Sequence, residues 1–250
     1  MKSVRILAGL SLAALFALLS PAVRAQSGSF EIAENGHPVG TASFKFAATP
    51  SGFDSSSIVR VTMQGLDYAL SKTERLTPNN HLRHVLLSAV VNKSAVTVET
   101  APEATQFRIN ISASGRSSTI RLPAHPGAVF LPDFDPGALE TLLALAVDQN
   151  NRNLWAILPK KTGSQVASIE PVQLATYPDM HGTLNGHPIT VHHLVATIAG
   201  AETELFSGPD NQLLQAELPQ QGFALVRKGF VLTPPAKPLA APGNQQTTTP

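Results

Sequence analysis

The sequence predicts a mainly β protein: a large curved antiparallel sheet, a half-barrel or open barrel, with one packed α-helix. Three observations favour this fold. Short runs rich in Val, Ile and Thr recur along the chain between turn signals of Gly, Pro, Asn and Asp. Apolar and polar residues alternate within several of these runs, as in strands with one buried face. A single segment near the middle of the chain has the leucine spacing of a packed helix.

Two Asn-Gly pairs predict β-hairpins. Asn35-Gly36 lies inside residues 29–46 (SFEIAENGHPVGTASFKF), and Asn185-Gly186 lies near the start of residues 182–232. Both residues of a type I′ turn need positive φ, which Asn and Gly tolerate best. The pentapeptides NGHPV and NGHPI are nearly identical. Two interpretations account for this likeness: an internal repeat, or the same turn sequence used twice. The diverging sequences that follow favour the second interpretation.

Residues 56–122 continue the strand pattern. Phe107, Ile109 and Ile111 alternate with polar neighbours, which predicts an antiparallel sheet with one apolar and one wet face. The C-terminal stretch 182–232 is a further series of short strands, and we expect the core to be built on it. The other strand candidates are SIVRVTMQ, LDYALSKTERL, HLRHVLLSAVVN, AVTVET, TQFRINISAS, STIRLPA, LWAILP and SQVASIEPVQLAT.

The helix is predicted near residues 136–148. Asp135 is a good N-cap residue and Pro136 suits the first turn. Leu139, Leu142, Leu143 and Ala146 form an apolar stripe that we interpret as core packing. The simplest arrangement lays this helix against the apolar face of the sheet or across the end of a curled sheet.

The ends of the chain have different compositions from its centre. Residues 1–25 resemble a signal peptide, with a basic start, an apolar run at residues 6–19 and small residues before Gln26, where we expect cleavage. We therefore expect an exported protein, periplasmic or extracellular, with no membrane span after cleavage. Residues 26–232 are predicted to form a single sheet domain, and residues 233–250, rich in Pro, Gln and Thr, a disordered tail.

Composition excludes several functions. The chain has no cysteine, which removes disulfides, thiol catalysis and Cys-ligated zinc. Cleavage before Gln26 would leave 15 basic and 17 acidic residues, a net charge of −2. That balance argues against a nucleic-acid partner. No Gly-rich phosphate loop occurs, so we expect no cofactor.

A histidine group near residue 190 is the strongest candidate for chemistry. His181, His187 and His193 are the residues considered as metal ligands. His187 and His193 share one strand face but lie about 20 Å apart along an extended strand, too far to bind one ion. We therefore expect surface or packed histidines and no metal site.

An enzyme with dispersed acid and base residues remains an alternative. The sequence lacks the Gly-x-Ser-x-Gly, Ser-x-x-Lys and His-Glu-x-x-His motifs. His84, His193, Asp179 and Glu204 are the candidates for general acid and base roles, and the catalytic residues stay unknown. Convergence of two of them in a cleft would favour this hypothesis.

The apolar sheet face carries the leading hypothesis. A filled core is the common arrangement, and a curled sheet with the helix over an apolar cavity is the functional alternative. Under this second interpretation the helix and one strand would line the cavity. The ligand-lining candidates are Leu139, Leu142, Leu143, Phe107, Ile109 and Ile111.

Two segments carry a resemblance to a family. FEIAENGHPVGTASFKF resembles the start of a group of exported bacterial domain-of-unknown-function proteins, and ETELFSGPDNQLLQAELPQQGFALVRKGF resembles the ending of the same group. The resemblance implies a curved sheet shaped like periplasmic lipoprotein carriers of the LolA type. It supplies no catalytic residues.

These observations favour an exported, non-enzymatic protein of the bacterial envelope. We expect it to bind a lipid or other hydrophobic small molecule, or an envelope protein partner, on the curved sheet. A structural envelope protein that acts through an exposed sheet edge is a further alternative.

Overall fold

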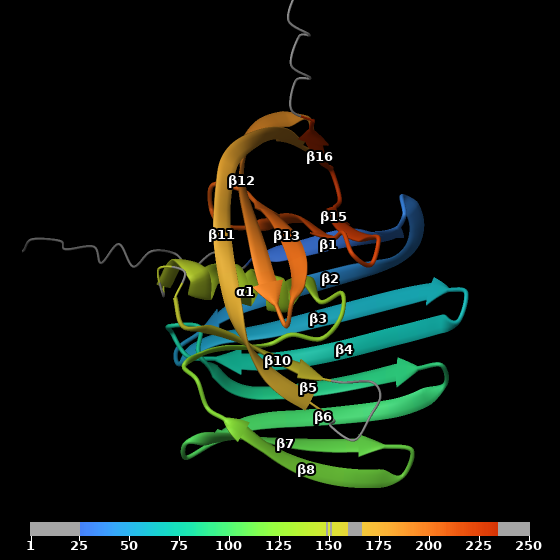
Figure 1. Cartoon of the computed structure of the whole chain (residues 1–250), viewed down its shortest axis with the longest axis vertical. Coiled ribbons are helices and arrows are strands. Elements are labelled where there is room, and N and C mark those ends of the chain that lie inside the picture. The colour runs from blue at the N-terminus through green and yellow to red at the C-terminus, as the bar shows by residue number, and fades with distance from the viewer. Residues whose placement is uncertain (1–25, 149, 151, 160–166, 235–250) are drawn as a thin grey trace, which may run out of the picture.

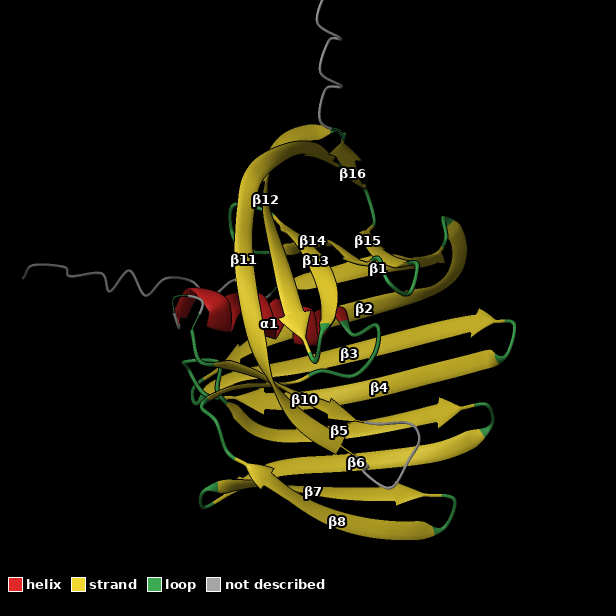
Figure 2. Cartoon of the chain, viewed as in Figure 1, coloured by secondary structure: helices red, strands yellow, loops and turns green. Residues whose placement is uncertain are grey.

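The computed structural model describes residues 26–148, 150, 152–159 and 167–234. Within these residues the chain forms one open, curved sheet of 16 strands and a single α-helix, as predicted (Figures 1 and 2). The predicted signal peptide, 1–25, lies outside the described residues, and so does the predicted tail from residue 235 onward. Thr233, the first residue of that predicted tail, is the last residue of a strand.

The first half of the chain is an antiparallel meander of eight strands. Each strand pairs with the next, so local hairpins build this half of the sheet. The strands are β1 Ser27–Glu34, β2 His37–Thr49, β3 Gly52–Met63, β4 Leu66–Leu76, β5 Leu82–Val91, β6 Ser94–Glu103, β7 Gln106–Ala113 and β8 Arg116–Pro123.

The second half returns along the other edge of the meander. Helix α1 (Pro136–Asp148) connects its first two strands, and β15 pairs with β1, which joins the two halves into one sheet. The strands are β9 Gly127–Phe130, β10 Leu154–Pro159, β11 Ala167–Leu184, β12 His187–Ile198, β13 Ala201–Ser207, β14 Leu213–Leu218, β15 Phe223–Arg227 and β16 Phe230–Thr233.

The sheet is antiparallel except where β9 pairs with β10. From one edge of the sheet to the other, the strand order is β8-β7-β6-β5-β4-β3-β2-β1-β15-β14-β13-β12-β11-β10-β9. β16 lies outside this series and pairs with β11. β9 and β10 are parallel. Parallel neighbours need a long crossover, and α1 is that crossover. The short strand β9 was not among the strands expected from the sequence.

Helix α1 lies inside the curled sheet. It contacts β2 and β3 from the first half and β9, β10 and β14 from the second. Side chains on all sides of the helix are buried from Pro136 to Leu143, whereas Val147 near its end is 59% exposed. A helix that is apolar all round belongs in an interior. The helix therefore packs against the apolar face of the sheet, as expected, and the second half of the sheet covers its other side.

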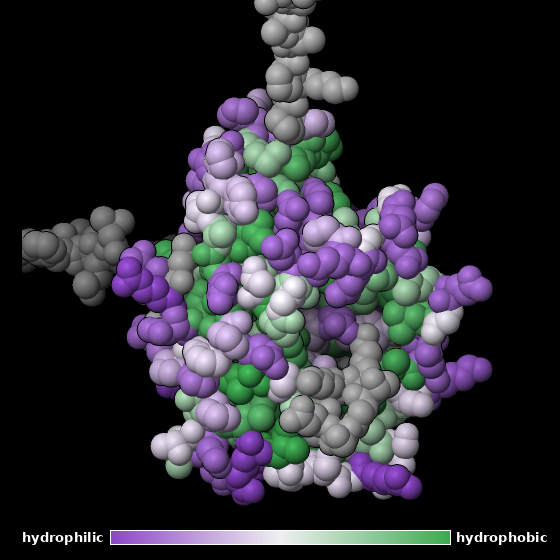
Figure 3. Space-filling model, viewed as in Figure 1, coloured by the Kyte–Doolittle hydropathy of each residue, from purple (hydrophilic) through white to green (hydrophobic). Residues whose placement is uncertain are grey.

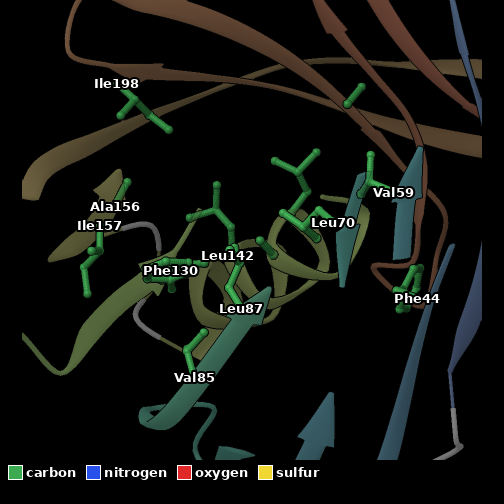
Figure 4. Close-up of a cluster of buried hydrophobic side chains, with 14 of the residues drawn as sticks. Phe44, Val59, Leu70, Val85, Leu87, Phe130, Leu142, Ala156, Ile157 and Ile198 are labelled. Atoms are coloured by element: carbon green, nitrogen blue, oxygen red, sulfur yellow. The ribbon is translucent and has the colours of Figure 1, made fainter. Parts of the chain in front are cut away.

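Figure 4 shows the helix end-on, with Leu142 near the centre of a buried cluster. Phe44, Val59, Leu70 and Leu87 come from the first half, and Phe130, Ile157 and Ile198 from the second. Residues from Phe30 to Leu225 belong to this cluster. The expectation that the core is built on residues 182–232 is therefore wrong. That stretch contributes only part of the main cluster, and four of its residues form a smaller second cluster: Val191, Phe206, Leu214 and Phe230.

Both Asn-Gly turns have the predicted conformation. The φ angles are 48° and 81° at Asn35 and Gly36, and 52° and 81° at Asn185 and Gly186. Each turn is braced alike: Asn35 N donates to Gly222 O at 2.7 Å, and Asn185 N donates to Gly229 O at 2.8 Å. The shared pentapeptide thus corresponds to one kind of turn used twice.

Polar side chains project along the strand ends in Figure 3, with hydrophobic patches between them. Among the described residues, no helix has the length and hydropathy needed to cross a membrane.

Candidate functional site

The histidines considered as metal ligands do not converge. His181 and His187 are exposed on β11 and β12, whereas His193 is largely buried. Among the described residues, no group of three or more His, Asp or Glu side chains is arranged to hold a metal ion.

The acid and base candidates form three separate pairs. His84 Nε2 lies 3.2 Å from Glu99 Oε1, and His192 Nδ1 lies 2.9 Å from Asp179 Oδ1. His193 Nε2 lies 3.2 Å from Glu204 Oε2. Consecutive strand residues point to opposite faces, so His192 and His193 serve different surfaces. The His84 pair lies on β5 and β6 in the first half of the sheet, whereas the other two pairs lie on β11, β12 and β13.

His193 is held by aromatic packing as well as by Glu204. Its ring stacks on Phe206, with centroids 4.7 Å apart and an interplanar angle of 11°, and lies 5.0 Å from the ring of Tyr177. The strand register places Tyr177, His193 and Phe206 side by side on β11, β12 and β13. This geometry fixes the orientation of the imidazole between two aromatic rings and a carboxylate.

The six predicted ligand-lining residues all belong to the main hydrophobic cluster. Leu139, Leu142 and Leu143 are buried on α1, and Phe107, Ile109 and Ile111 are buried on β7. The six residues therefore lie in the hydrophobic core between the sheet and the helix. Leu139 also reaches a pocket of about 200 Å³ beside the start of α1.

This pocket, which we call the α1 pocket, lies between the segment before α1 and the strands of the second half. Half-buried leucines from three elements open onto it: Leu131, Leu158 and Leu218. The remaining lining residues are Pro132, Asp133, Phe134, Asp135, Leu139, Ile198, Ala201, Thr203, Gln221 and Leu225. Nine of the thirteen lining residues are apolar, so an apolar ligand group would be covered by apolar surface.

The segment 131–135 owes its position to backbone and aromatic contacts. Leu131 N donates to Ile157 O at 2.9 Å, which ties the segment to β10. Phe134 has a φ of 57°, a costly conformation for a large side chain. Its ring packs edge-on against two other rings, with 6.3 Å between the centroids of Phe134 and Tyr68 and 4.9 Å between those of Phe134 and Phe223. Phe134 thus joins strands of both halves at the rim of the pocket.

A buried ion-pair cluster holds the start of α1. Lys72 Nζ lies 2.7 Å from Asp135 Oδ2 and 3.3 Å from Glu74 Oε2, and the three side chains are buried. Asp135 Oδ1 accepts hydrogen bonds from Gly137 N at 2.9 Å and Ala138 N at 3.2 Å, which confirms its predicted capping role. Asp135 therefore links the helix to β4 while lining the α1 pocket.

Burial and charge act together in this cluster. Burial lowers the pKa of Lys72, but attraction by Asp135 and Glu74 outweighs it and leaves that pKa above its usual value. Burial raises the pKa of Glu74, and repulsion from Asp135 adds to the shift although Lys72 opposes it. The lysine is therefore charged, and the glutamate is shifted toward its neutral form.

Two serines complete a polar block on the inner sheet face. Ser55 is paired with Glu74 across β3 and β4, and Ser57 with Lys72. The hydroxyls of both serines and Glu74 Oε1 are buried and have no hydrogen-bond partner among the described residues. Sequence reasoning missed this block, although alternation in LDYALSKTERL places Lys72 and Glu74 on the same face as Leu70 and Leu76.

A second buried carboxylate fastens α1 to the opposite half of the sheet. Glu140 Oε2 accepts a hydrogen bond from Leu213 N at 2.7 Å. Burial raises the pKa of Glu140 to about 7, although this hydrogen bond and Arg227 favour its charged form. The pairing of β13 with β14 shifts register between Phe206 and Ser207, next to Leu213. Together with Asp135, Glu140 anchors the helix on two sides.

No family model matches the chain, and no curated protein matches its sequence. Among solved structures, a DUF1089 family protein from Pseudomonas aeruginosa matches with a TM-score of 0.42 and 11% sequence identity. That match covers 88% of this chain and 98% of the other.

Proposed function

We propose that this protein binds a small apolar ligand in the α1 pocket and that it acts as an exported, non-enzymatic protein of the bacterial envelope. The observation that carries the proposal is the pocket's lining, nine apolar residues contributed by elements of the second half, by α1 and by the segment before it. Concave, mostly apolar sites with a few polar groups are the usual form of ligand pockets.

The anchoring of α1 supports the proposal. The walls of the pocket include Asp135 and Leu139, and the helix that carries Leu139 is fixed to β4 through Asp135 and to β14 through Glu140. A wall that does not move on binding lowers the ordering cost of association. Burying these charged contacts costs free energy. Their role in holding the pocket in one preformed shape accounts for their presence.

Export and a carrier role belong to the same proposal. The N-terminal sequence pattern supports export. The resemblance to exported proteins with a LolA-type shape supports an apolar cargo in the envelope. A pocket of about 200 Å³ is small, so we propose that it takes one short apolar group or the end of a longer chain.

Native mass spectrometry combined with lipid extraction tests the proposal. The full chain is expressed in a bacterium, purified without detergent and measured intact. Ala201, half-buried on β13, lines the pocket, so Ala201→Phe would fill it. We expect an apolar adduct on the wild-type protein and its loss in Ala201→Phe. Ala69→Phe is the matched control, because Ala69 is exposed on β4 away from the pocket.

A wild-type protein that carries no adduct and takes up no added 1-octanol would contradict the proposal. Equal adducts on wild type and Ala201→Phe would place the ligand elsewhere. Absence of any adduct would favour the alternative of an envelope partner bound along a sheet edge. β8 is the edge at the end of the first half, paired in the sheet with β7, and most of its side chains are exposed.

A further inference from the structure

A second pocket lies at the start of β1, where the two halves of the sheet join. β1 lies between β2 and β15 (Figure 1). β15 ends at Arg227, opposite Phe30, so residues 27–29 of β1 extend past its end. The space beside them has a volume of about 380 Å³. We call it the β1 pocket, and its lining residues are Ser27, Gly28, Ser29, Ser43, Phe44, Arg227 and Lys228.

The β1 pocket carries positive charge. Among the described residues that line it, Arg227 and Lys228 are basic and none is Asp or Glu. Three others are serines, whose hydroxyls can donate hydrogen bonds. Ser29 pairs with Ser43 across β1 and β2, and Ser27 lies on the same strand face as Ser29. The pocket therefore combines cations with neutral donors, as sites that bind oxyanions do.

Arg227 is held against β1 by contacts within the protein. Its Nη1 donates to Leu213 O at 3.0 Å, its Nη2 donates to Ser27 O, and the guanidinium lies 5.8 Å from the centre of the Phe30 ring. A Cβ at Gly28 would lie 3.2 Å from Nη1, so glycine at this position permits the close approach. These hydrogen bonds use two of the five N–H donors of a guanidinium. The charged group is thus preorganised at the pocket.

An anion next to Arg227 would be favourable for an electrostatic reason. Burial lowers the pKa of Arg227, although attraction by Glu140 opposes this shift. Glu140 is buried and does not line the β1 pocket. An anion in the pocket would therefore compensate a cation that burial has partly removed from water.

Lys228 provides the second cation of the pocket. Its side chain is exposed, and its backbone N donates to Ser29 O at 2.8 Å, which keeps the residue beside β1. Arginine and lysine supply different contacts to an oxyanion, the first a planar fork of donors and the second a mobile point charge. The two residues can therefore contact different oxygens of one tetrahedral group.

We infer that the β1 pocket binds a phosphate group, with Arg227 and Lys228 as its cations and the serine hydroxyls as neutral donors. This inference goes beyond the proposed function, because the β1 pocket and the α1 pocket share no lining residue. The phosphate group belongs either to a soluble phosphate or to a phospholipid headgroup. Both present anionic oxygens to the guanidinium, and the experiment separates them.

Backbone amide NMR with sodium phosphate tests the inference. The full chain, labelled with nitrogen-15, is titrated at pH 7.5 and constant ionic strength, with sodium chloride as the balancing salt. We expect saturable shifts at the amides of Gly28, Ser29 and Ser43, and none at Gly65 in the turn between β3 and β4. Shifts spread evenly over the chain, or no saturable shift, would overturn the inference.

Lys228→Gln assigns the binding to the pocket. The side chain is exposed and the backbone hydrogen bond to Ser29 is kept, so the variant should fold as the wild type does. We expect phosphate to bind about fivefold more weakly, the upper range for one exposed ion pair. Lys93→Gln is the matched control, because Lys93 is an exposed lysine in the turn between β5 and β6. Equal effects of the two substitutions would overturn the assignment to the β1 pocket.

Co-sedimentation with phosphatidylglycerol vesicles identifies the source of the phosphate group. A protein that responds to sodium phosphate and sediments with vesicles, less so as Lys228→Gln, binds a phospholipid headgroup. A protein that responds to sodium phosphate and stays in solution binds a soluble phosphate. Sedimentation without a saturable phosphate shift would overturn the inference, because attraction to the charged vesicle surface would then not involve a phosphate site in the β1 pocket.

Discussion

Lys72 Nζ lies 2.7 Å from Asp135 Oδ2, with both side chains excluded from solvent. Lys72 is an inward position of the fourth strand and Asp135 is the N-cap of the only helix among the described residues. The contact joins residues 63 positions apart. It determines where the helix begins inside the sheet, and hence where Leu139 and the 131–135 segment meet to form the α1 pocket.

Removing the lysine should destabilise the fold strongly. Lys72→Met leaves Asp135 and Glu74 buried without a cation, and we expect a loss of about 3–5 kcal/mol in the free energy of unfolding. Urea denaturation measures it. Lys45→Met changes an exposed lysine of β2 and should cost less than about 0.5 kcal/mol. Equal effects of the two substitutions would show that the buried cluster does not hold the fold.

Adding one methyl group at the start of α1 should also be costly. A Cβ at Gly137 would clash with Ser57 Oγ and lie 3.2 Å from Phe44 Cβ. Gly137→Ala should therefore destabilise the protein by about 1–3 kcal/mol, although alanine favours helices. Ser57→Ala removes the clashing oxygen, so the double variant should recover part of the loss in urea denaturation. Additive losses would contradict this contact.

Glu140 should make stability depend on pH. Its pKa is raised from 4.5 to about 7 by burial, so the folded protein keeps a proton that the unfolded chain releases between these values. The contribution of Glu140 to the free energy of unfolding is therefore largest below pH 4.5. It falls by about 3 kcal/mol in total as the pH rises through 7.

Glu140→Gln isolates this effect. Glutamine keeps an oxygen for the Leu213 N–H and cannot ionise. Urea denaturation at pH 5, 6, 7 and 8 should show the variant gaining stability relative to wild type as pH rises. Parallel pH profiles for the two proteins would mean that Glu140 does not titrate in the folded state in this range.

Shortening a buried side chain of α1 should destabilise the protein far more than shortening an exposed one. Leu142 is 1% exposed at the centre of the main cluster, whereas Val147 on the same helix is 59% exposed. Leu142→Ala should cost about 2–5 kcal/mol and Val147→Ala less than about 0.5 kcal/mol. Thermal and urea unfolding measure both. Similar costs would contradict the placement of α1 inside the sheet.

Local sequence signals predicted much of the fold. Asn35-Gly36 and Asn185-Gly186 predicted two turns correctly because both residues of each pair must adopt positive φ. Asp135 and Pro136 predicted the start of α1 because a cap acts within a few residues. Alternation along β7 placed Phe107, a core residue, on the buried face.

Long-range relationships could not be predicted in the same way. The hydrogen bond from Leu213 to Glu140 spans 73 residues and depends on the strand order, which local patterns do not determine. The α1 pocket depends on the same order, because its lining combines residues 131–139 with Leu158 and with residues 198–225. Burial of Lys72 was foreseeable from strand alternation, but its partner Asp135 comes from another element.

Methyl NMR with 1-octanol tests the central claim, that the α1 pocket receives an apolar ligand. Methyl-labelled wild-type protein is titrated, and shifts are followed at Leu131, Leu158 and Leu218 in the pocket and at Ile58 and Val90, which are exposed on the sheet. We predict saturable shifts confined to the pocket methyls. Shifts centred on Ile58 and Val90, or no saturable shift, would contradict the claim.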